Sequence, residues 1–144
     1  MQSRVPHDHA AVHGLAPYVH VADVERSLSF YEQLGLVRQG THAVDGRTVW
    51  GSMRNGQAHI MFAQADPEVD DALQGVLFYL YSKDVRALRS HLVGCGLRDM
   101  SAPPQAGVSA RGVVFPIQKP FYMPAGELRV HDPDGYCLLI GQLA

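Results

Sequence analysis

Clusters of basic residues and long apolar runs are both missing from this sequence. Lysine and arginine number 12 against 14 acidic residues, the formal net charge is -2, and the basic residues are scattered. Proteins that track a phosphate backbone carry a basic stripe, so we expect no nucleic-acid partner. The longest strongly apolar run, residues 75–81, is far shorter than the roughly 20 residues that span a bilayer, so no membrane contact is expected.

Cysteine is scarce as well. Cys95 and Cys137 are the only two, and neither stands in a CxxC or zinc-finger spacing. No disulfide framework is therefore expected, and both residues are predicted to be reduced, buried thiols. The N-terminus lacks the apolar segment of a secretory signal, and together these features favour a cytoplasmic protein.

Three of the eight histidines, His7, His9 and His13, crowd into the first fourteen residues. A His-x-His pair can chelate a metal, but a stable site needs ligands that are held in place. A terminal segment of this composition is expected to be mobile, so residues 1–13 are interpreted as a mobile N-terminal segment.

An internal repeat is the strongest signal that is present. Displacing the sequence by 61 residues lays residues 16–36 on residues 77–97. The coinciding positions are Tyr18 with Tyr79, Asp23 with Asp84, Val24 with Val85, Ser29 with Ser90, Gly35 with Gly96, and Leu36 with Leu97. With 144 residues, 47% of them hydrophobic, the chain is long enough for one structural domain built from two related modules.

Each copy of the repeat has the same predicted order of elements. An alternating segment rich in aromatic and β-branched residues predicts a strand. Asp23 and Asp84 then stand as helix N-caps, and Gly35 and Gly96 stand where a helix ends. The helices between them each have one apolar face, formed by Val24, Leu28, Tyr31 and Leu34 in the first copy and by Val85, Leu88, Leu92 and Cys95 in the second.

Strands are predicted after each helix. In the first module, residues 14–64, they are 37–43, 48–53 and 58–64, joined by Asp-Gly and Asn-Gly turns. A linker with a possible short helix, residues 65–74, leads to the second module, residues 75–144, with strands at 97–101, 127–131 and 136–141. The insertion 102–126 has no counterpart in the first copy, and its prolines argue against a central strand, although residues 112–117 could form a short edge.

The two modules resemble the vicinal oxygen chelate superfamily, which includes glyoxalase I, extradiol dioxygenases and bleomycin-resistance proteins. The resemblance is carried by "VADVERSLSFYEQLGL" in the first module and "HDPDGY" in the second. It implies an α+β fold, with two tandem βαβββ modules whose mixed sheets form a curved cup and whose helices cover the outer face.

Metal-using members of this superfamily place ligands on the first and last strand of each module. The matching positions here are Ala16, Met61, Leu77 and Leu139. None of them supplies the nitrogen or oxygen donors that a divalent cation needs. The resemblance therefore implies the metal-free, bleomycin-resistance-like branch, with no cofactor and with binding rather than catalysis as the expected activity.

Strand alternation from those four positions identifies the side chains that face the cup. The predicted ligand-binding residues are Tyr18, His20, Trp50, His59, Met61, Tyr79, Tyr81, Glu127 and Arg129, with Thr48, Ser52, Arg54 and His131 on the same side. His131 is expected at the rim. Aromatic rings with hydroxyl and imidazole tips suit a planar or aromatic compound, and Arg129 could pair with a carboxylate or stack on a ring.

The residues leave several alternatives open. Glu127 and Arg129 could simply pair with each other while the tyrosines fill a ligandless barrel, which would make the chain a non-binding scaffold. His20, His59 and Glu127 could instead form a non-standard metal site in an isomerase, lyase or dioxygenase. Small relatives commonly form homodimers, and the leading hypothesis is a dimeric antibiotic-resistance type of protein that sequesters a small molecule, with the insertion as a lid or partner contact.

Overall fold

A computed structural model describes residues 10, 14–65, 77–104 and 110–143. The three N-terminal histidines of the predicted mobile segment, nearly all of the predicted linker 65–74, and residues 105–109 of the insertion lie outside the described residues.

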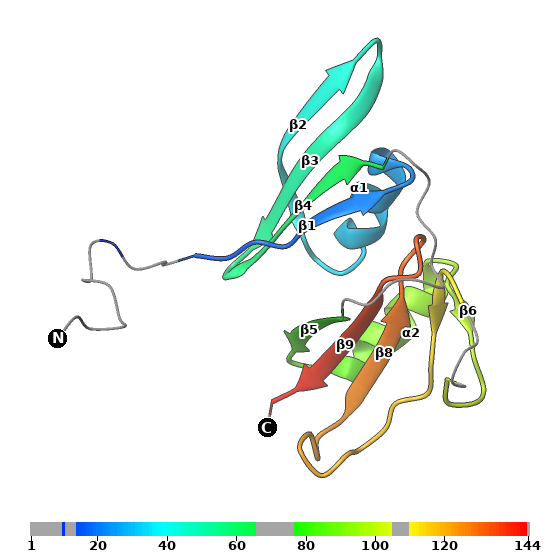
Figure 1. Cartoon of the computed structure of the whole chain (residues 1–144). Helices are drawn as coiled ribbons and strands as arrows, with labels where there is room; N and C mark the ends of the chain where they lie inside the picture. Colours follow the sequence, from blue (N-terminus) through cyan, green and yellow to red (C-terminus); the bar gives the residue numbers. More distant parts are fainter. Residues whose placement is uncertain (1–9, 11–13, 66–76, 105–109, 144) are drawn as a thin grey trace, which may run out of the picture.

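The first module is a four-stranded sheet with one helix. Its elements are β1 (Tyr18–Val21), α1 (Val24–Glu32), β2 (Val37–Val44), β3 (Arg47–Asn55) and β4 (Ala58–Gln64). The strand order is β1-β4-β3-β2, with β1 parallel to β4 and the other neighbours antiparallel (Figure 1). The predicted strands match these bounds within a few residues, which is what two strong hairpin turns should produce.

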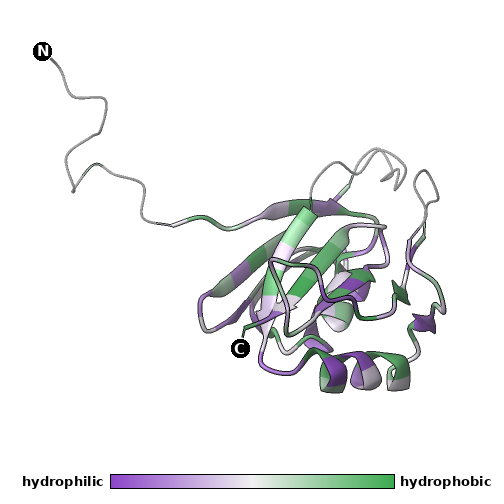
Figure 2. Cartoon of the chain, turned by 90° about the horizontal axis from the view of Figure 1, so that it is seen from below, coloured by the Kyte–Doolittle hydropathy of each residue, from purple (hydrophilic) through white to green (hydrophobic). Residues whose placement is uncertain are grey.

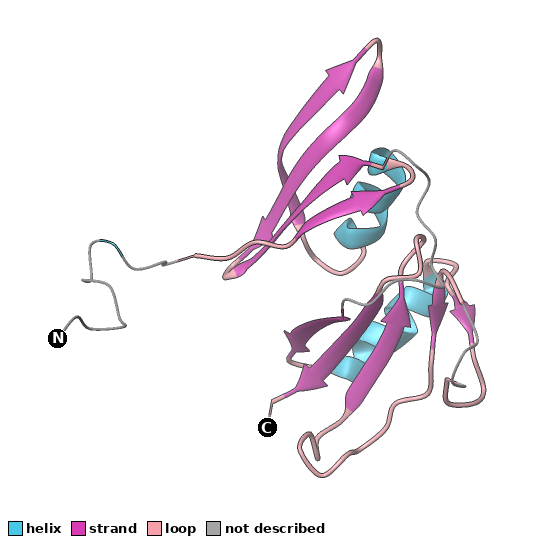
Figure 3. Ribbon diagram, viewed as in Figure 1, coloured by secondary structure: helices cyan, strands magenta, loops and turns pink. Residues whose placement is uncertain are grey.

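The second module has the same topology with one strand added. Its elements are β5 (Leu77–Ser82), α2 (Val85–Gly94), β6 (Arg98–Asp99), β7 (Val113–Val114), β8 (Glu127–His131) and β9 (Cys137–Gln142). The order is β5-β9-β8-β7-β6, so the two sheets are separate and not closed into a barrel. Figure 3 shows one helix against each sheet, which confirms the predicted α+β class.

The added strand β7 comes from the insertion and lies inside the sheet, between β8 and β6, whereas the sequence suggested a short edge. Val113 and Val114 are fully buried, and burial on both faces explains their place in the interior. The strand is only two residues long. Pro116 follows closely, and proline has no N–H to donate to a sheet ladder. The predicted strand 97–101 is likewise reduced to the two residues of β6.

The two copies of the repeat have matching local geometry. The Asp23 carboxylate accepts the backbone N–H of Arg26 at 3.1 Å, and the Asp84 carboxylate accepts that of Ala87 at 3.0 Å. Gly35 has a φ of 96° and Gly96 a φ of 101°, a region that favours glycine. The N-caps and helix ends predicted from the repeat are therefore confirmed.

One continuous core joins the two modules. It combines Tyr31 of α1 and Phe62 of β4 with Leu138 and Ile140 of β9, all buried. The helices alternate hydrophobic and hydrophilic stretches, as expected for one buried face (Figure 2). Cys137 is buried as predicted, whereas Cys95, which was also predicted to be buried, is exposed.

Cys95 is exposed because it is the C-cap of α2, beyond the part of the helix that the sheet covers. Its sulfur lies 3.6 Å from Nε2 of His91, one turn earlier in the helix.

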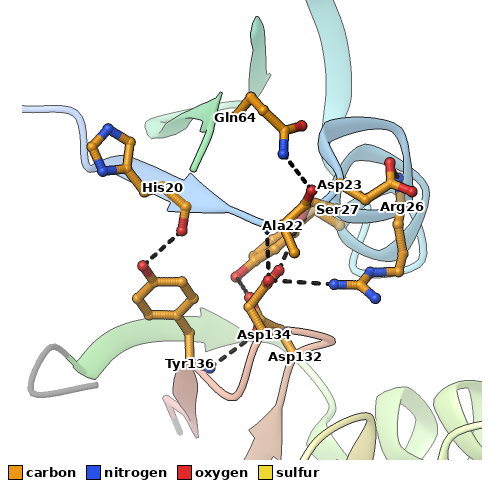
Figure 4. A network of polar contacts seen from close by, with 10 residues as sticks. His20, Ala22, Asp23, Arg26, Ser27, Gln64, Asp132, Asp134 and Tyr136 are labelled. Atoms are coloured by element: carbon orange, nitrogen blue, oxygen red, sulfur yellow. Dashed lines mark hydrogen bonds and ion pairs between the residues drawn. The ribbon is translucent and has the colours of Figure 1, made fainter. Parts of the chain in front are cut away.

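Asp134 of the β8–β9 turn fastens the second module to the first. Its carboxylate is fully buried and accepts the backbone N–H of Ala22 at 2.9 Å, Nη2 of Arg26 at 3.3 Å and the hydroxyl of Ser27 at 3.4 Å (Figure 4). The donors are the backbone N–H of Ala22, between β1 and α1, and two side chains from the first part of α1, so the turn of the second module is hydrogen-bonded to the helix start of the first.

Asp132, in the same turn, is also fully buried and makes a second link. Its Oδ2 accepts the hydroxyl of Tyr31 at 2.8 Å, and its Oδ1 accepts the backbone N–H groups of Asp134 and Tyr136 at 2.8 and 2.9 Å. The Tyr136 hydroxyl donates to the carbonyl of His20 at 2.9 Å. We call these contacts of Asp132, Asp134 and Tyr136 the inter-module latch.

Candidate functional site

The face of the first sheet that points away from α1 carries five predicted site residues. Val19 and Val21 of β1 are buried, so alternation places Tyr18 and His20 on the opposite, open face. Tyr18 is paired with Met61, which is paired with Ser52 of β3. The remaining members of this face are His20 paired with Ala63, Trp50 paired with the same Ala63, and His59 paired with Arg54.

Two contacts fix side chains on this open face. The Oγ of Ser52 lies 3.0 Å from Nε2 of His59, so this histidine has a hydrogen-bond partner in the sheet. The ring of Trp50 lies over Gly40 of β2, where an added Cβ would come within 3.6 Å of Cζ3.

Thr48 does not belong to this face, contrary to the sequence-based prediction. Its hydroxyl donates to Oε1 of Glu25 on α1 at 2.9 Å, which places it on the helix side. The reason is a register shift between His42 and Ala43, where β3 contributes an extra residue opposite β2. Such a bulge reverses the alternation locally, and strict alternation cannot anticipate it.

The open face of the second sheet is aromatic at its edge strand. Leu77, Tyr79 and Tyr81 of β5 are 56%, 41% and 63% exposed, while the intervening Phe78 and Leu80 are partly buried against the core. The rings of Tyr79 and Tyr81 are 5.5 Å apart. Both predicted tyrosines are therefore accessible and adjacent.

Glu127 accepts hydrogen bonds from two tyrosines. The Tyr79 hydroxyl donates to Oε2 at 2.6 Å, and the Tyr122 hydroxyl donates to Oε1 at 3.2 Å. Desolvation, followed by the contact with Glu127, raises the pKa of Tyr79 well above its usual value, and the pKa of Tyr122 is raised for the same reasons. Both hydroxyls therefore stay protonated and act as donors to the carboxylate.

Arg129 is held by different partners. Its Nε donates to Nε2 of His131 at 3.0 Å, and its guanidinium carbon lies 5.8 Å from the centre of the Phe115 ring. His131, expected at the rim, is buried, because its ring packs edge-on against Phe115 with centroids 5.0 Å apart. Among the described residues Glu127 and Arg129 form no ion pair, so the alternative in which they only neutralise each other is not what the structure shows.

A pocket of about 190 Å³ lies over this part of the second sheet. Its lining residues are Pro104, Phe115, Pro116, Gln118, Tyr122, Glu127, Arg129 and Leu139. Sequence reasoning found Glu127 and Arg129 but missed Phe115 and Tyr122, because the insertion has no counterpart in the first copy. The available signal was the run of aromatic residues between prolines at positions 115–124.

A larger pocket, of about 310 Å³, lies between the modules. It is lined on the helix side of both sheets by apolar residues such as Tyr31, Ile60, Phe78 and Leu138, and it reaches His59 and Tyr79 at its edge. It offers few polar groups that could orient a ligand, whereas the smaller pocket has a carboxylate and a guanidinium. We therefore regard the open faces and the smaller pocket as the candidate site.

A cluster of metal-binding side chains is not found in the described part of the chain, which contains no group of three or more His, Cys, Asp or Glu residues suited to an ion. His20, His59 and Glu127, the residues of the alternative metal site, are therefore not gathered into such a group in the described structure. Met61 is paired with Tyr18, and Leu139 with Tyr79, so these two of the four family ligand positions occupy matching places in the two sheets.

The described residues also include no helix that is both long and apolar enough to cross a membrane.

The fold and the sequence together define the class of protein. The chain matches the Glyoxalase/Bleomycin resistance protein/Dioxygenase superfamily over residues 8–140, and it belongs to that superfamily. No curated protein sequence matches it.

Solved structures with the same fold include antibiotic-binding proteins. A bleomycin-binding protein in complex with bleomycin has a TM-score of 0.68 at 17% identity, covering 92% of this chain and 100% of that one. A bleomycin-binding protein from Streptomyces verticillus, in complex with copper(II)-bleomycin, has a TM-score of 0.63 at 16% identity and covers 94% and 99%. TnmS3, an antibiotic-binding protein from Streptomyces sp. CB03234, has a TM-score of 0.60 at 17% identity and covers 94% and 98%. At these identities the likeness extends to the fold.

Proposed function

We propose that this chain is a metal-free small-molecule binding protein that holds a planar or aromatic compound against its open sheet faces, without a covalent step. The observation that carries the proposal is the set of accessible rings on those faces, Tyr18, Trp50, Tyr79 and Tyr81. Rings of this kind supply large contact areas at low conformational cost, and nearby His59, Glu127 and Arg129 supply polar groups that would fix orientation.

The similar structures favour an antibiotic or a comparable metabolite as the ligand class. Two of them are bleomycin-binding proteins and a third is an antibiotic-binding protein. By analogy, this chain would protect a cell by sequestering such a compound in the cytoplasm. Fold alone does not determine function, so the analogy supports the proposal only together with the aromatic faces.

A homodimer is part of the proposal. The modules of one chain pack through a shared core, while Tyr18, Leu77 and Tyr81 remain 57%, 56% and 63% exposed. Large apolar side chains left exposed at the sheet edges are candidates for burial at an interface or a binding site. A second copy would cover part of these faces and leave a crevice for the ligand between the two chains.

Static light scattering tests the dimer. The expected mass is twice that of the 15.8 kDa chain, and Leu77→Lys should shift the population toward monomer. A wild-type protein that stays monomeric at micromolar concentration would contradict this part of the proposal.

Ligand binding is tested by a thermal-shift screen of planar aromatic antibiotics, followed by fluorescence titration. Trp50 is the only tryptophan, so its emission reports directly on the open face of the first sheet. A bound compound should change that emission and raise the melting temperature, by the equivalent of about 2.7 kcal/mol at a concentration of 100 times its Kd.

Tyr18→Ala should weaken binding about tenfold or more, since it removes one ring from the face. Val44→Ala is the matched control, because Val44 is 49% exposed but lies at the far end of β2. The proposal fails if no compound shifts the melting temperature, or if the hits leave Trp50 emission unchanged and bind both variants equally.

A further inference from the structure

The pocket over the second sheet contains one negative and one positive group held at a fixed separation. Glu127 and Arg129 are two residues apart on β8, and both line the pocket. A strand rises about 3.3 Å per residue, so the two side chains leave the sheet about 7 Å apart on the same face. The structure records no ion pair between them, and each is held by other residues.

The acidic end is pre-organised as an acceptor. Each carboxylate oxygen of Glu127 receives one tyrosine hydroxyl, from Tyr79 and from Tyr122, and no lysine or arginine among the described residues pairs with it. A carboxylate oxygen can accept more than one hydrogen bond, so both oxygens keep capacity for a further donor. The positions of these oxygens are set before a ligand arrives.

The basic end is pre-organised as a donor. Arg129 uses Nε to bind His131 and rests on the Phe115 ring, while Nη1 and Nη2 make no hydrogen bond to any described residue. His131 accepts at Nε2, so Nδ1 carries the ring proton and donates to the carbonyl of Ala110 at 3.0 Å. The terminal amino groups of the guanidinium are thus left to bind a carboxylate.

We propose that this pocket recognises a zwitterionic head group of the amino acid type, with its ammonium against Glu127 and its carboxylate against Arg129. A ligand with only a positive charge would be attracted by Glu127 and repelled by Arg129 at nearly the same distance. A ligand with only a negative charge would be attracted by Arg129 and repelled by Glu127. Only a group with both charges gains from both residues. Leu139, paired with Arg129 in the sheet, provides an apolar floor for the carbon atoms.

This inference rests on the proposed function, because it names the class of compound that the same open face would hold. The pocket volume of about 190 Å³ is suited to a head group with a small side chain. A larger ligand would place its planar part over Tyr79 and Tyr81, whose rings continue the face along the edge strand.

Three ligands that share a phenol ring test the inference on the full-length chain. L-tyrosine carries both charges, tyramine carries only the ammonium, and 3-(4-hydroxyphenyl)propionate carries only the carboxylate. Each is titrated at low ionic strength while the Nε–H signal of Arg129 is followed by NMR. Tyrosine is expected to bind about tenfold or more tightly than either analogue, as for one added charge-assisted hydrogen bond.

Charge-removing variants assign the two ends. Glu127→Gln should abolish the advantage of tyrosine over the propionate, and Arg129→Gln should abolish its advantage over tyramine. Glu32→Gln and Arg47→Gln are the controls, since these exposed residues lie outside the pocket. Arg129 also packs on Phe115, so Arg129→Lys is a second variant that keeps the charge and should retain a carboxylate preference.

Equal affinities for the three ligands, no detectable binding of any of them, or a preference for tyrosine over the propionate that survives Glu127→Gln would each overturn the inference. If planar aromatic compounds still change Trp50 emission in that case, the proposed function stands without it. A chain that binds neither kind of compound contradicts both.

Discussion

Asp134→Ala should lower the free energy of unfolding by about 2 to 4 kcal/mol, a large part of the total stability of a domain of this size. The carboxylate is fully buried, and its removal leaves the Ala22 N–H and the Ser27 hydroxyl without their acceptor. Each buried donor left unpaired costs about 1 to 3 kcal/mol. Arg26 adds little, because its side chain is 44% exposed and can be hydrated.

Asp134→Ala should also reduce the cooperativity of unfolding between the modules, since the hydrogen bonds of Asp134 join the start of α1 to the β8–β9 turn. Trp50 emission reports on the first module, and far-UV circular dichroism reports on both. The two probes should give coincident urea transitions in the wild type and separated transitions in the variant.

Asp23→Ala is the matched control for this variant. Asp23 is an aspartate at the same helix start, but its bond to the N–H of Arg26 stays within the first module. Its removal should cost about 1 kcal/mol, as for other N-caps, and leave the transitions coincident. Equal losses in the two variants would show that the latch contributes no more than a helix cap.

Asp132→Asn should change how stability depends on pH. Burial raises the pKa of Asp132 from 3.8 to about 6, even though the hydrogen bond from Tyr31 and two backbone N–H groups favour the charged form. The neighbouring Asp134 carboxylate raises the pKa further. The folded state therefore holds a proton on Asp132 more tightly than the unfolded state does.

The sign of the effect follows from that raised pKa. The stability contributed by this proton is fully present below pH 3.8 and is lost as the pH rises through about 6. A shift of this size corresponds to about 3 kcal/mol. Asparagine cannot ionise, and its amide nitrogen can donate toward the Tyr31 hydroxyl as a protonated carboxyl group would.

The difference in unfolding free energy, variant minus wild type, should therefore increase by about 3 kcal/mol between pH 3 and pH 8. Urea denaturation at a series of pH values measures it. Groups such as Glu25, whose pKa is lowered by Arg38, titrate in both proteins and cancel in the difference. Parallel stability curves for the two proteins would exclude a raised pKa at Asp132.

The parts of the fold that repeat could be predicted from the sequence. Asp23, Asp84, Gly35 and Gly96 each have a local role, as a cap or a helix end, that a single sequence reveals through residue type and spacing. The latch could not be predicted in this way. Asp132 and Asp134 were visible only as turn residues, because their partners in the first module lie more than 100 positions away.

The candidate site, too, could be predicted only in part. Alternation placed Tyr18, His20, Tyr79 and Tyr81 on exposed faces, since β1 and β5 are regular strands whose intervening residues are buried in β1 and partly buried in β5. Alternation assigned Thr48 to the wrong face, because the bulge in β3 reverses the alternation there.

Partners from the insertion were also out of reach of the sequence. The setting of Arg129 depends on Phe115, and that of Glu127 depends on Tyr122. These contacts join the insertion to β8, and no repeat, motif or spacing in the sequence predicts them.

The central claim, that the open sheet faces hold a small planar molecule, is tested most directly by mapping a screening hit on the protein with NMR. We expect the largest shift changes at the Trp50 indole N–H, the Met61 methyl group and the ring protons of Tyr18 and Tyr79, with little change at the buried methyl groups of Leu28 and Leu92 on the helix side. Changes confined to the helix side, with the open-face signals unmoved, would contradict the account.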